Sequence, residues 1–326
     1  MVIIMNKTAL RQILRAAGFV FLIAVFLSAA SFMLEPKNNT PDSGIKSTAL
    51  YGFLSEPENT IDIAVIGNSD VGNGFSPLEL WNKYGYTSYV CAEPWQTVPQ
   101  GYSVLKKFLR RQKPRLVILE TDGFFDSANL ANTAACIAEP IRGGFMSLKQ
   151  YHNRWKTAKP DELFKKPRYT YHCASKGQWY SNDVKGYTGG EYMVKTDKKA
   201  EIPLSTKAAL DIFVKICREN AAELLFTELP SQSSWSYKKH NAVKDYADKN
   251  GVSFLDLNID RDSYGFDWKT DTRDGGNHLN NRGARKATLF IGKYINENYS
   301  LSDHRKDEAF KSWDRDYREY CEKVKI

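Results

Sequence analysis

The stretch 61-IDIAVIGNSDVGNGFSP-77 begins as a run of aliphatic residues and stops abruptly at Gly67, Asn68, Ser69 and Asp70. A short apolar run bounded by turn-forming residues is typical of a strand that is buried on both faces. The turn after it either only reverses the chain or presents Ser69 as a nucleophile. Read alone, the stretch favours the simple turn.

Downstream of this stretch, strand-like runs alternate with segments of helix length. This alternation predicts an α/β fold, in which a mainly parallel sheet is covered by helices on both faces as a three-layer α/β/α sandwich. The further strands are expected in SYVCA (88–92), RLVILETD (115–122), AELLFTELP (222–230) and VSFLDL (252–257), and the helices near 76–84, 98–112, 205–220, 236–250 and 280–298.

The regular alternation is interrupted once, between residues 123 and 200. That segment is rich in Gly, Tyr, Trp and Lys and lacks aliphatic runs, so it is predicted to be an insertion in a domain that covers residues 60–300. The densely charged residues 301–326 form a C-terminal extension, expected to be a peripheral helix. The aromatic side chains of the insertion either line a sugar-binding surface or fill a small core beneath it; they are Trp155, Tyr169, Tyr171, Trp179 and Tyr180.

The N-terminal region, residues 1–35, is predicted to be a membrane anchor. Residues 16–34 carry no charge, and such a run spans about 30 Å as a helix, the thickness of a hydrocarbon core. Lys7, Arg11 and Arg15 precede it, which places the N-terminus in the cytoplasm and the remaining chain outside the cell membrane. A cleaved signal peptide is the alternative, because LSAASF offers small residues near a cleavage site. The polar residues 36–59 are expected to be a linker.

The net charge of +8 and the pI of about 9.0 come from basic residues spread along the whole chain. A diffuse positive field suits a membrane surface or an anionic, phosphate-bearing polymer. No long Lys/Arg block is present, so a nucleic acid is not expected as a partner.

A serine hydroxyl becomes a good nucleophile only when a base removes its proton. Of the five histidines, His278 alone lies in a loop between the last predicted strand and the last predicted helix, in DTRDGGNHLNNRGARKAT (271–288). That loop returns to the sheet edge where Ser69 is expected. Ser69 and His278 together therefore favour a nucleophile over a simple turn.

IGNSDV at the first strand and DGGNHLNNRGA before the last helix resemble the first and last sequence blocks of the SGNH/GDSL hydrolase superfamily. The chain more closely resembles one branch of this superfamily, the membrane-anchored, extracytoplasmic branch that looks like the D-alanyl-lipoteichoic acid biosynthesis proteins. This closer resemblance rests on the order of the blocks, the N-terminal anchor, and the stretches PLELWNKYGYTSYVCAEPWQT and FTELPSQSSWSYKKHNAVKDYADKNGVSFLDL. The resemblance covers roughly residues 60–122 and 205–298. It implies a flavodoxin-like SGNH fold.

Carried onto this sequence, the resemblance implies that Ser69 is the nucleophile and His278 the general base. The family places its acid three residues before the histidine, where this chain has Gly275. Asp274, four residues before His278, is the expected acid, and Asp271 is the alternative.

The oxyanion hole departs from the family pattern. CAEPWQT lacks the expected Gly and LETDGFF lacks the expected Asn. Besides the Ser69 backbone N–H, Gln96 is the preferred second donor and Asn73 the other candidate.

The resemblance implies acyl transfer through a seryl ester, with a D-alanyl or acetyl group on a cell-envelope polymer such as teichoic acid, beside a membrane-bound O-acyltransferase as partner. A polysaccharide O-acetyl esterase and a non-catalytic scaffold are the alternatives. No cofactor and no metal site are expected, because the loop 256–267 has Arg261 and Asp267 where a calcium loop needs Gly and Glu.

Overall fold

The computed structural model describes residues 7–324 apart from 128, 130, 132, 135, 137–150, 157–159, 163 and 260. Its centre is a five-stranded, wholly parallel sheet with strand order β2-β1-β3-β4-β5. This is the flavodoxin-like order of doubly wound folds. The strands are β1 Ile63–Gly67, β2 Ser88–Ala92, β3 Leu116–Glu120, β4 Glu223–Glu228 and β5 Ser253–Asp256.

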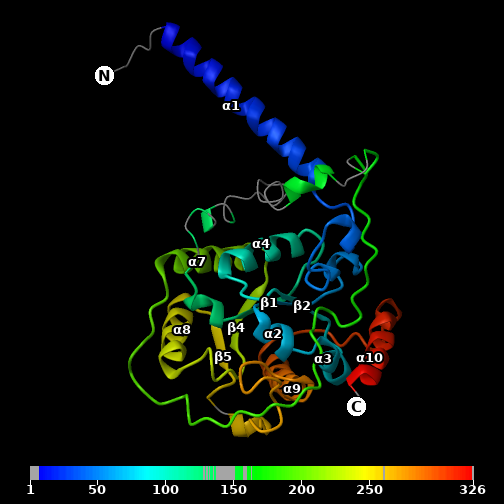
Figure 1. The fold of residues 1–326 in the computed structure, drawn as a ribbon, viewed down its shortest axis with the longest axis vertical. Coiled ribbons are helices and arrows are strands. Elements are labelled where there is room, and N and C mark those ends of the chain that lie inside the picture. The colour runs from blue at the N-terminus through cyan, green and yellow to red at the C-terminus, as the bar shows by residue number, and fades with distance from the viewer. Residues whose placement is uncertain are drawn as a thin grey trace.

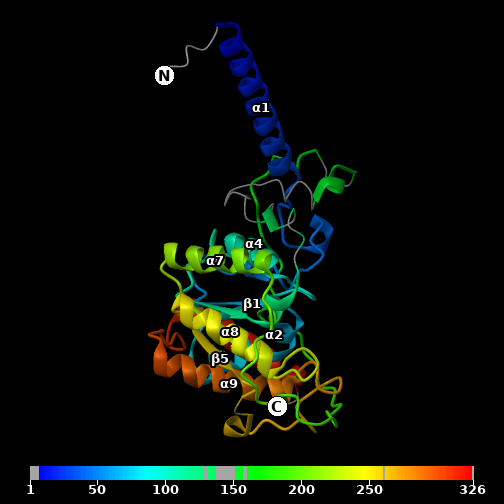
Figure 2. The same ribbon diagram turned by 90° about the vertical axis from the view of Figure 1, so that its left-hand side faces the viewer.

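Helices cover both faces of the sheet, which confirms the predicted α/β/α sandwich (Figures 1 and 2). α4 (Val98–Phe108) and α7 (Leu204–Glu219) lie on one face, where α8 (Tyr237–Asn250) joins the same apolar cluster. α3 (Pro77–Tyr84) and α9 (Asn281–Asn298) cover the opposite face. The first three strands are buried along their whole length, which explains their continuous aliphatic sequences.

Strand ends meet at one edge of this sheet. Gly67 of β1 pairs with Ala92 of β2, and Glu120 of β3 pairs with Thr227 of β4. Helix α2 (Ser69–Gly74) begins immediately beyond β1. In open parallel sheets this carboxyl edge is where ligands bind.

Helix α1 (Lys7–Leu34) projects away from the α/β body (Figures 1 and 2). It is long and apolar enough to cross a membrane, and large side chains such as Phe19 and Phe26 are 65% and 71% exposed. A signal sequence has the same length and composition.

The segment 36–59 is folded onto the domain, so the prediction of a free linker was wrong. Phe53 in this segment is fully buried between Tyr89 and Phe108, and Ile45 and Leu50 join the same core. The segment contains the short 3-10 helices Pro41–Ser43 and Gly52–Ser55. Apolar side chains at these positions give it a buried face that its polar composition conceals.

The C-terminal extension contains α10 (Lys311–Val324), which packs on α3 through Trp313 and Tyr320. A buried ion network ties this helix to the rest of the chain. Lys176 Nζ lies 2.6 Å from Glu56 Oε1 and 2.8 Å from Asp316 Oδ2, and all three side chains are at most 2% exposed. The segment before β1, the insertion and the C-terminal extension therefore share one structural unit.

The predicted insertion 123–200 lies partly outside the described residues. Its described part includes the 3-10 helices Asp122–Phe125 and His152–Lys156 and otherwise runs as loop. Of its aromatic residues, Trp155 is 68% exposed, whereas Tyr171, Trp179 and Tyr180 pack against the core clusters. A small core beneath the insertion thus accounts for most of them.

Candidate active site

Ser69 is the first residue of α2, directly beyond β1. Asn68 caps this helix, since its side-chain oxygen accepts a hydrogen bond from the Asp70 N–H at 2.7 Å. The Ser69 N–H is at a position that has no acceptor within the helix. The predicted turn is therefore a strand-to-helix junction that presents the serine at the carboxyl edge of the sheet.

His278 lies in the loop that leads into α9, and its Nε2 is 2.9 Å from Ser69 Oγ. The loop doubles back on itself, because the Arg273 N–H donates to the His278 carbonyl at 3.0 Å and Thr272 bridges to Leu279. This pairing holds the imidazole in place across 209 residues of sequence separation.

Asp274 completes the hydrogen-bonded chain, with Oδ2 2.6 Å from His278 Nδ1. Its other oxygen accepts the backbone N–H groups of Asn277 and His278 at 3.1 and 2.8 Å. Partial burial raises the pKa of Asp274, but these hydrogen bonds and the neighbouring His278 outweigh it, and the pKa lies below its ordinary value. The carboxylate is thus held ionised beside the imidazole.

Two glycines explain how an acid four residues before the histidine reaches it. Gly275 and Gly276 have φ angles of 92° and 101°, which other residues rarely adopt. A Cβ on Gly276 would lie 2.6 Å from a side-chain carbon of Gln232. The glycine pair accommodates the extra residue of the loop.

Asp271, the alternative acid, serves a different purpose. It is fully buried beneath α9, where it pairs with Lys286 at 2.7 Å and Arg282 at 3.2 Å and accepts the Asp267 N–H. The structure therefore brings Asp274, and not Asp271, to His278.

Gln96 is placed unfavourably for the predicted oxyanion role. Its amide nitrogen donates to the carbonyls of Gly67 at 2.9 Å and Cys91 at 3.2 Å, which uses both of its hydrogens. The prediction that Gln96 donates to an oxyanion is corrected to a positioning contact that joins the ends of β1 and β2.

Asn73 is closer to the serine, but its amide serves the helix. Nδ2 donates to the Ser69 carbonyl at 2.8 Å, and Oδ1 accepts from Arg273 at 2.8 Å. These contacts tie α2 to the loop of His278. One amide hydrogen of Asn73 remains for a further acceptor.

Three buried carboxyl groups beneath Ser69 were missed at the level of sequence. Asp70, Glu120 and Glu228 are at most 6% exposed, and their oxygens lie within 4.8 Å of one another. Glu120 and Glu228 end β3 and β4, so two acids closing apolar strands were the available signal.

Burial, and after it the repulsion from neighbouring carboxylates such as Asp122, raises the pKa of all three groups, that of Glu120 to about 8. Hydrogen-bond donors reach two of them: Thr121 donates to Glu228 at 2.6 Å, and the N–H groups of Asp122 and Asn68 donate to Glu120 at 2.6 and 3.4 Å. A cluster of this kind binds protons or a cation.

Asp122 and Lys239 stand beside this cluster. The lysine lies 2.8 Å from one Asp122 oxygen, and Asn68 donates to the other at 3.3 Å. This ion pair links α8 to the cap of the helix that carries Ser69.

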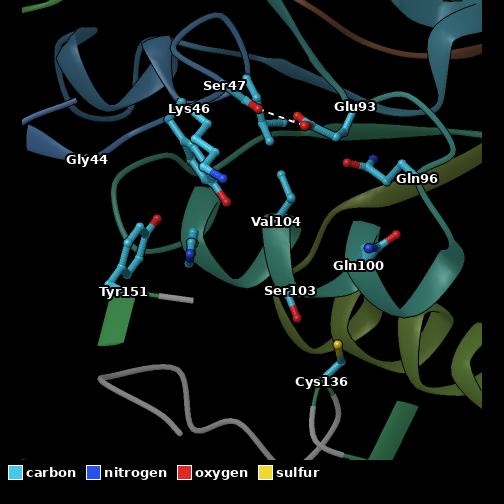
Figure 3. Close-up of a pocket in the computed structure, with 13 residues that line it drawn as sticks. Gly44, Lys46, Ser47, Glu93, Gln96, Gln100, Ser103, Val104, Cys136 and Tyr151 are labelled. Atoms are coloured by element: carbon cyan, nitrogen blue, oxygen red, sulfur yellow. Dashed lines mark hydrogen bonds between the residues drawn. The ribbon is translucent and has the colours of Figure 1, made fainter. Parts of the chain in front are cut away.

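A cavity of about 460 Å³ lies beside the loop that follows β2 (Figure 3). One wall is formed by residues 44–51, and α4 forms another, with Tyr51, Val104 and Tyr151 as apolar lining. Glu93 and Gln96 face it from the loop after β2, where Glu93 accepts a hydrogen bond from Ser47 at 2.7 Å.

The insertion also contacts the helix that carries the serine. The Trp179 N–H donates to the Gly72 carbonyl at 2.7 Å, and a Cβ on Gly72 would lie 2.8 Å from the Trp179 ring. Glycine at this position lets the indole close on α2. The insertion therefore packs against the helix that begins at Ser69.

Comparison with known proteins gives only distant structural similarities. No family model matches the chain. No curated protein matches it. The solved structures that resemble it include a lipase/acylhydrolase from Enterococcus faecalis, with 11% identity, a TM-score of 0.42, and coverage of 74% of this chain and 98% of that one.

Two further structures are similar to the same extent. A family 3 carbohydrate esterase from Clostridium thermocellum has 16% identity, a TM-score of 0.37, and coverage of 73% and 96%. A GDSL-like lipase from Bacteroides thetaiotaomicron has 12% identity, a TM-score of 0.35, and coverage of 72% and 87%. At these TM-scores the likeness carries no weight for activity, which must be inferred from the geometry of Ser69, His278 and Asp274.

Proposed function

We propose that this chain is a serine-dependent esterase or acyltransferase of the SGNH type. The observation that carries the proposal is the continuous chain from Ser69 Oγ through His278 to Asp274, with separations of 2.9 and 2.6 Å. Nucleophile, base and orienting acid in hydrogen-bond contact are the parts that acyl transfer requires. They meet at the carboxyl edge of a doubly wound sheet, where such sites lie.

In the proposed reaction, His278 Nε2 removes the proton of Ser69 as Oγ attacks the carbonyl carbon of an acyl ester. The tetrahedral intermediate collapses, the ester C–O bond breaks, and the departing alkoxide takes the proton from His278. Asp274 holds the Nδ1 proton and stabilises the imidazolium. Water or an acceptor hydroxyl then attacks the seryl ester with His278 again as base, which returns Ser69 to its free form.

The Ser69 N–H is the first oxyanion donor in this proposal. Asn73 is the second, because it lies one helical turn away and keeps one amide hydrogen. Gln96 is not available for this role, since both its hydrogens bind backbone carbonyls. Each well-placed donor contributes roughly 3 kcal/mol to the transition state.

The substrate that we propose is an O-acyl ester, D-alanyl or acetyl, on a cell-envelope polymer. Helix α1 supports this placement, because a single-pass anchor with basic residues before it would hold the domain outside the cell membrane. The net charge of +8 suits an anionic polymer such as teichoic acid. A membrane-bound O-acyltransferase as acyl donor remains part of the proposal on the resemblance alone.

A non-catalytic scaffold is the competing function. The commitment of Gln96 to backbone carbonyls favours it, because one expected oxyanion donor is lost. The intact contacts between Ser69, His278 and Asp274 favour catalysis. We therefore place the enzyme first.

The test is covalent labelling of the full chain in detergent with a serine-directed fluorophosphonate, read by intact mass. We expect one adduct on the unmodified protein, none on Ser69→Ala, and labelling slowed about 10³-fold or more in His278→Ala. Ser234→Ala is the matched control, since Ser234 also follows a strand but bonds to Ser231 at 2.9 Å. An adduct that persists in Ser69→Ala would reject the proposed nucleophile.

Hydrolysis and transfer are separated with an acetylated polysaccharide as donor. Release of free acetate that is independent of an added acceptor polymer identifies an esterase. If adding the acceptor polymer lowers the release of free acetate and the acceptor becomes acetylated, the chain is a transferase.

A further inference from the structure

Trp95 occupies a backbone conformation that tryptophan rarely adopts. Its φ is 58°, and the Gln96 N–H donates to the Glu93 carbonyl at 3.1 Å across the turn Glu93-Pro94-Trp95-Gln96. With Pro94 fixing its own φ near −65°, this is a type II turn, whose third position favours Gly or Asn. A bulky residue at that position strains the backbone.

The fold gains no burial from this tryptophan. Its side chain is 84% exposed, the highest exposure among the large apolar residues that the structure describes. The first and last residues of the same turn, Glu93 and Gln96, instead face the cavity beside the loop that follows β2 (Figure 3). The strain at Trp95 is therefore not offset by burial of its indole.

The turn that carries Trp95 is fixed to the strand that carries Ser69. Ala92, three residues before Trp95, pairs with Gly67, two residues before Ser69. The Gln96 side chain binds the Gly67 carbonyl at 2.9 Å, and Glu93 is held by Ser47 at 2.7 Å. The exposed indole thus belongs to a turn that is held to the end of the strand preceding Ser69.

We propose that Trp95 is the platform on which the sugar ring of the acylated polymer stacks. The inference rests on the proposed function and narrows its substrate to a polymer of pyranose rings. The face of an aromatic ring is electron-rich, and the C–H bonds on one face of a pyranose offer it a flat, weakly positive surface. A linear polyol phosphate has no such flat face.

The kinetic test compares two esters on the full chain in detergent. Trp95→Gly should lower kcat/KM on acetylated xylan oligosaccharides about ten-fold and leave 4-nitrophenyl acetate unchanged. Trp95→Phe should retain most of the activity on the oligosaccharide. Trp155→Gly is the matched control, because Trp155 is 68% exposed but lies on the 3-10 helix His152–Lys156.

A stability readout separates binding from folding. Since glycine is favoured at the strained position, Trp95→Gly should leave thermal stability unchanged or raise it while activity on the oligosaccharide falls. If Trp95→Gly lowered kcat/KM equally on the oligosaccharide and on 4-nitrophenyl acetate, the proposal would be overturned. A fall in kcat/KM seen only with a D-alanylated glycerol phosphate polymer would overturn it as well.

A binding test does not depend on catalysis. Titration calorimetry with an acetylated xylan oligosaccharide is run on Ser69→Ala and on Ser69→Ala with Trp95→Gly. About ten-fold weaker binding in the double variant supports the proposal, even if the unmodified chain hydrolyses no ester, and equal binding overturns it. Absence of fluorophosphonate labelling at Ser69 would reject the proposed function separately.

Discussion

Two sets of carboxyl groups flank Ser69, and their surroundings hold them in opposite states. Asp274 accepts hydrogen bonds from two backbone N–H groups and from the His278 ring, and its pKa lies below the ordinary value. Asp70, Glu120 and Glu228 are deeply buried near further carboxylates such as Asp122, and their pKa values are raised.

The difference shows that hydrogen-bond donors and burial, more than residue type, set the charge of a carboxyl group. An ionised Asp274 can orient an imidazole. The buried groups, if protonated, place little charge beneath the serine and thus leave the Ser69 proton free to be drawn toward His278.

The largest effect should come from removing the charge of Asp274. We expect Asp274→Asn to lower kcat about 10³–10⁴-fold, because the amide no longer stabilises the imidazolium and favours the wrong tautomer. The measurement is ester hydrolysis together with the rate of fluorophosphonate labelling.

Asp271→Asn is the control for that experiment. It should lower the free energy of unfolding, since Asp271 pairs with Lys286 and Arg282, and change the labelling rate only a few-fold. A reversed pattern would assign the orienting acid to Asp271.

The next effect concerns the buried set and is a stability effect. The folded protein keeps the Glu120 proton up to a pKa of about 8, whereas the ordinary value is 4.5. Between these pH values the folded state binds more protons than the unfolded state, so stability falls as pH rises. Burial also raises the pKa of Glu228 well above its ordinary value, so Glu228→Gln should flatten this fall by about 1.4 kcal/mol for each unit by which the Glu228 pKa is raised.

The measurement is urea unfolding at pH 5, 7 and 9. Glu58→Gln is the control, because Glu58 is 64% exposed and should leave the pH dependence unchanged. Parallel curves for the unmodified protein and Glu228→Gln would show that the carboxyl cluster holds no extra proton, and would direct attention to a bound cation.

The smallest effect should come from Asn68, which touches the buried set. Its side chain caps α2 and also donates to Asp122, so Asn68→Ala should cost about 1 kcal/mol in the free energy of unfolding and slow labelling of Ser69 several-fold. Ser236→Ala, which removes the cap of α8, should cost a similar amount without slowing the labelling. Equal labelling rates in both variants would show that the cap does not position the serine.

The strand and helix pattern could be predicted closely from sequence. All five predicted strands form, and the helices expected near 76–84, 205–220, 236–250 and 280–298 begin and end within one residue or so of those bounds. Continuous aliphatic runs and capping residues are local signals, so they can be recognised without knowledge of the tertiary structure. The helix α2 that begins at Ser69 was missed, because its sequence SDVGNG contains two glycines that weaken helix propensity.

The candidate site was predictable only in part. Ser69 and His278 could be paired because both follow strands of one sheet and such loops share an edge. Gln96 was misjudged, because the sequence does not show that two backbone carbonyls claim its amide. Residues 36–59 were misjudged as a linker, because a few apolar side chains such as Phe53 suffice to bury a mostly polar segment.

By itself, the sequence determined the parallel α/β sandwich, the apolar N-terminal helix and the two loops that hold Ser69 and His278. These follow from periodicity and from the rule that parallel strands end at a common edge. Only the tertiary structure decided between Asp274 and Asp271, through the backbone of Gly275 and Gly276, and only it gathered Asp70, Glu120 and Glu228 beneath the serine. The physical reason is that burial and hydrogen-bond partners belong to positions in space, and residues far apart in sequence create them together.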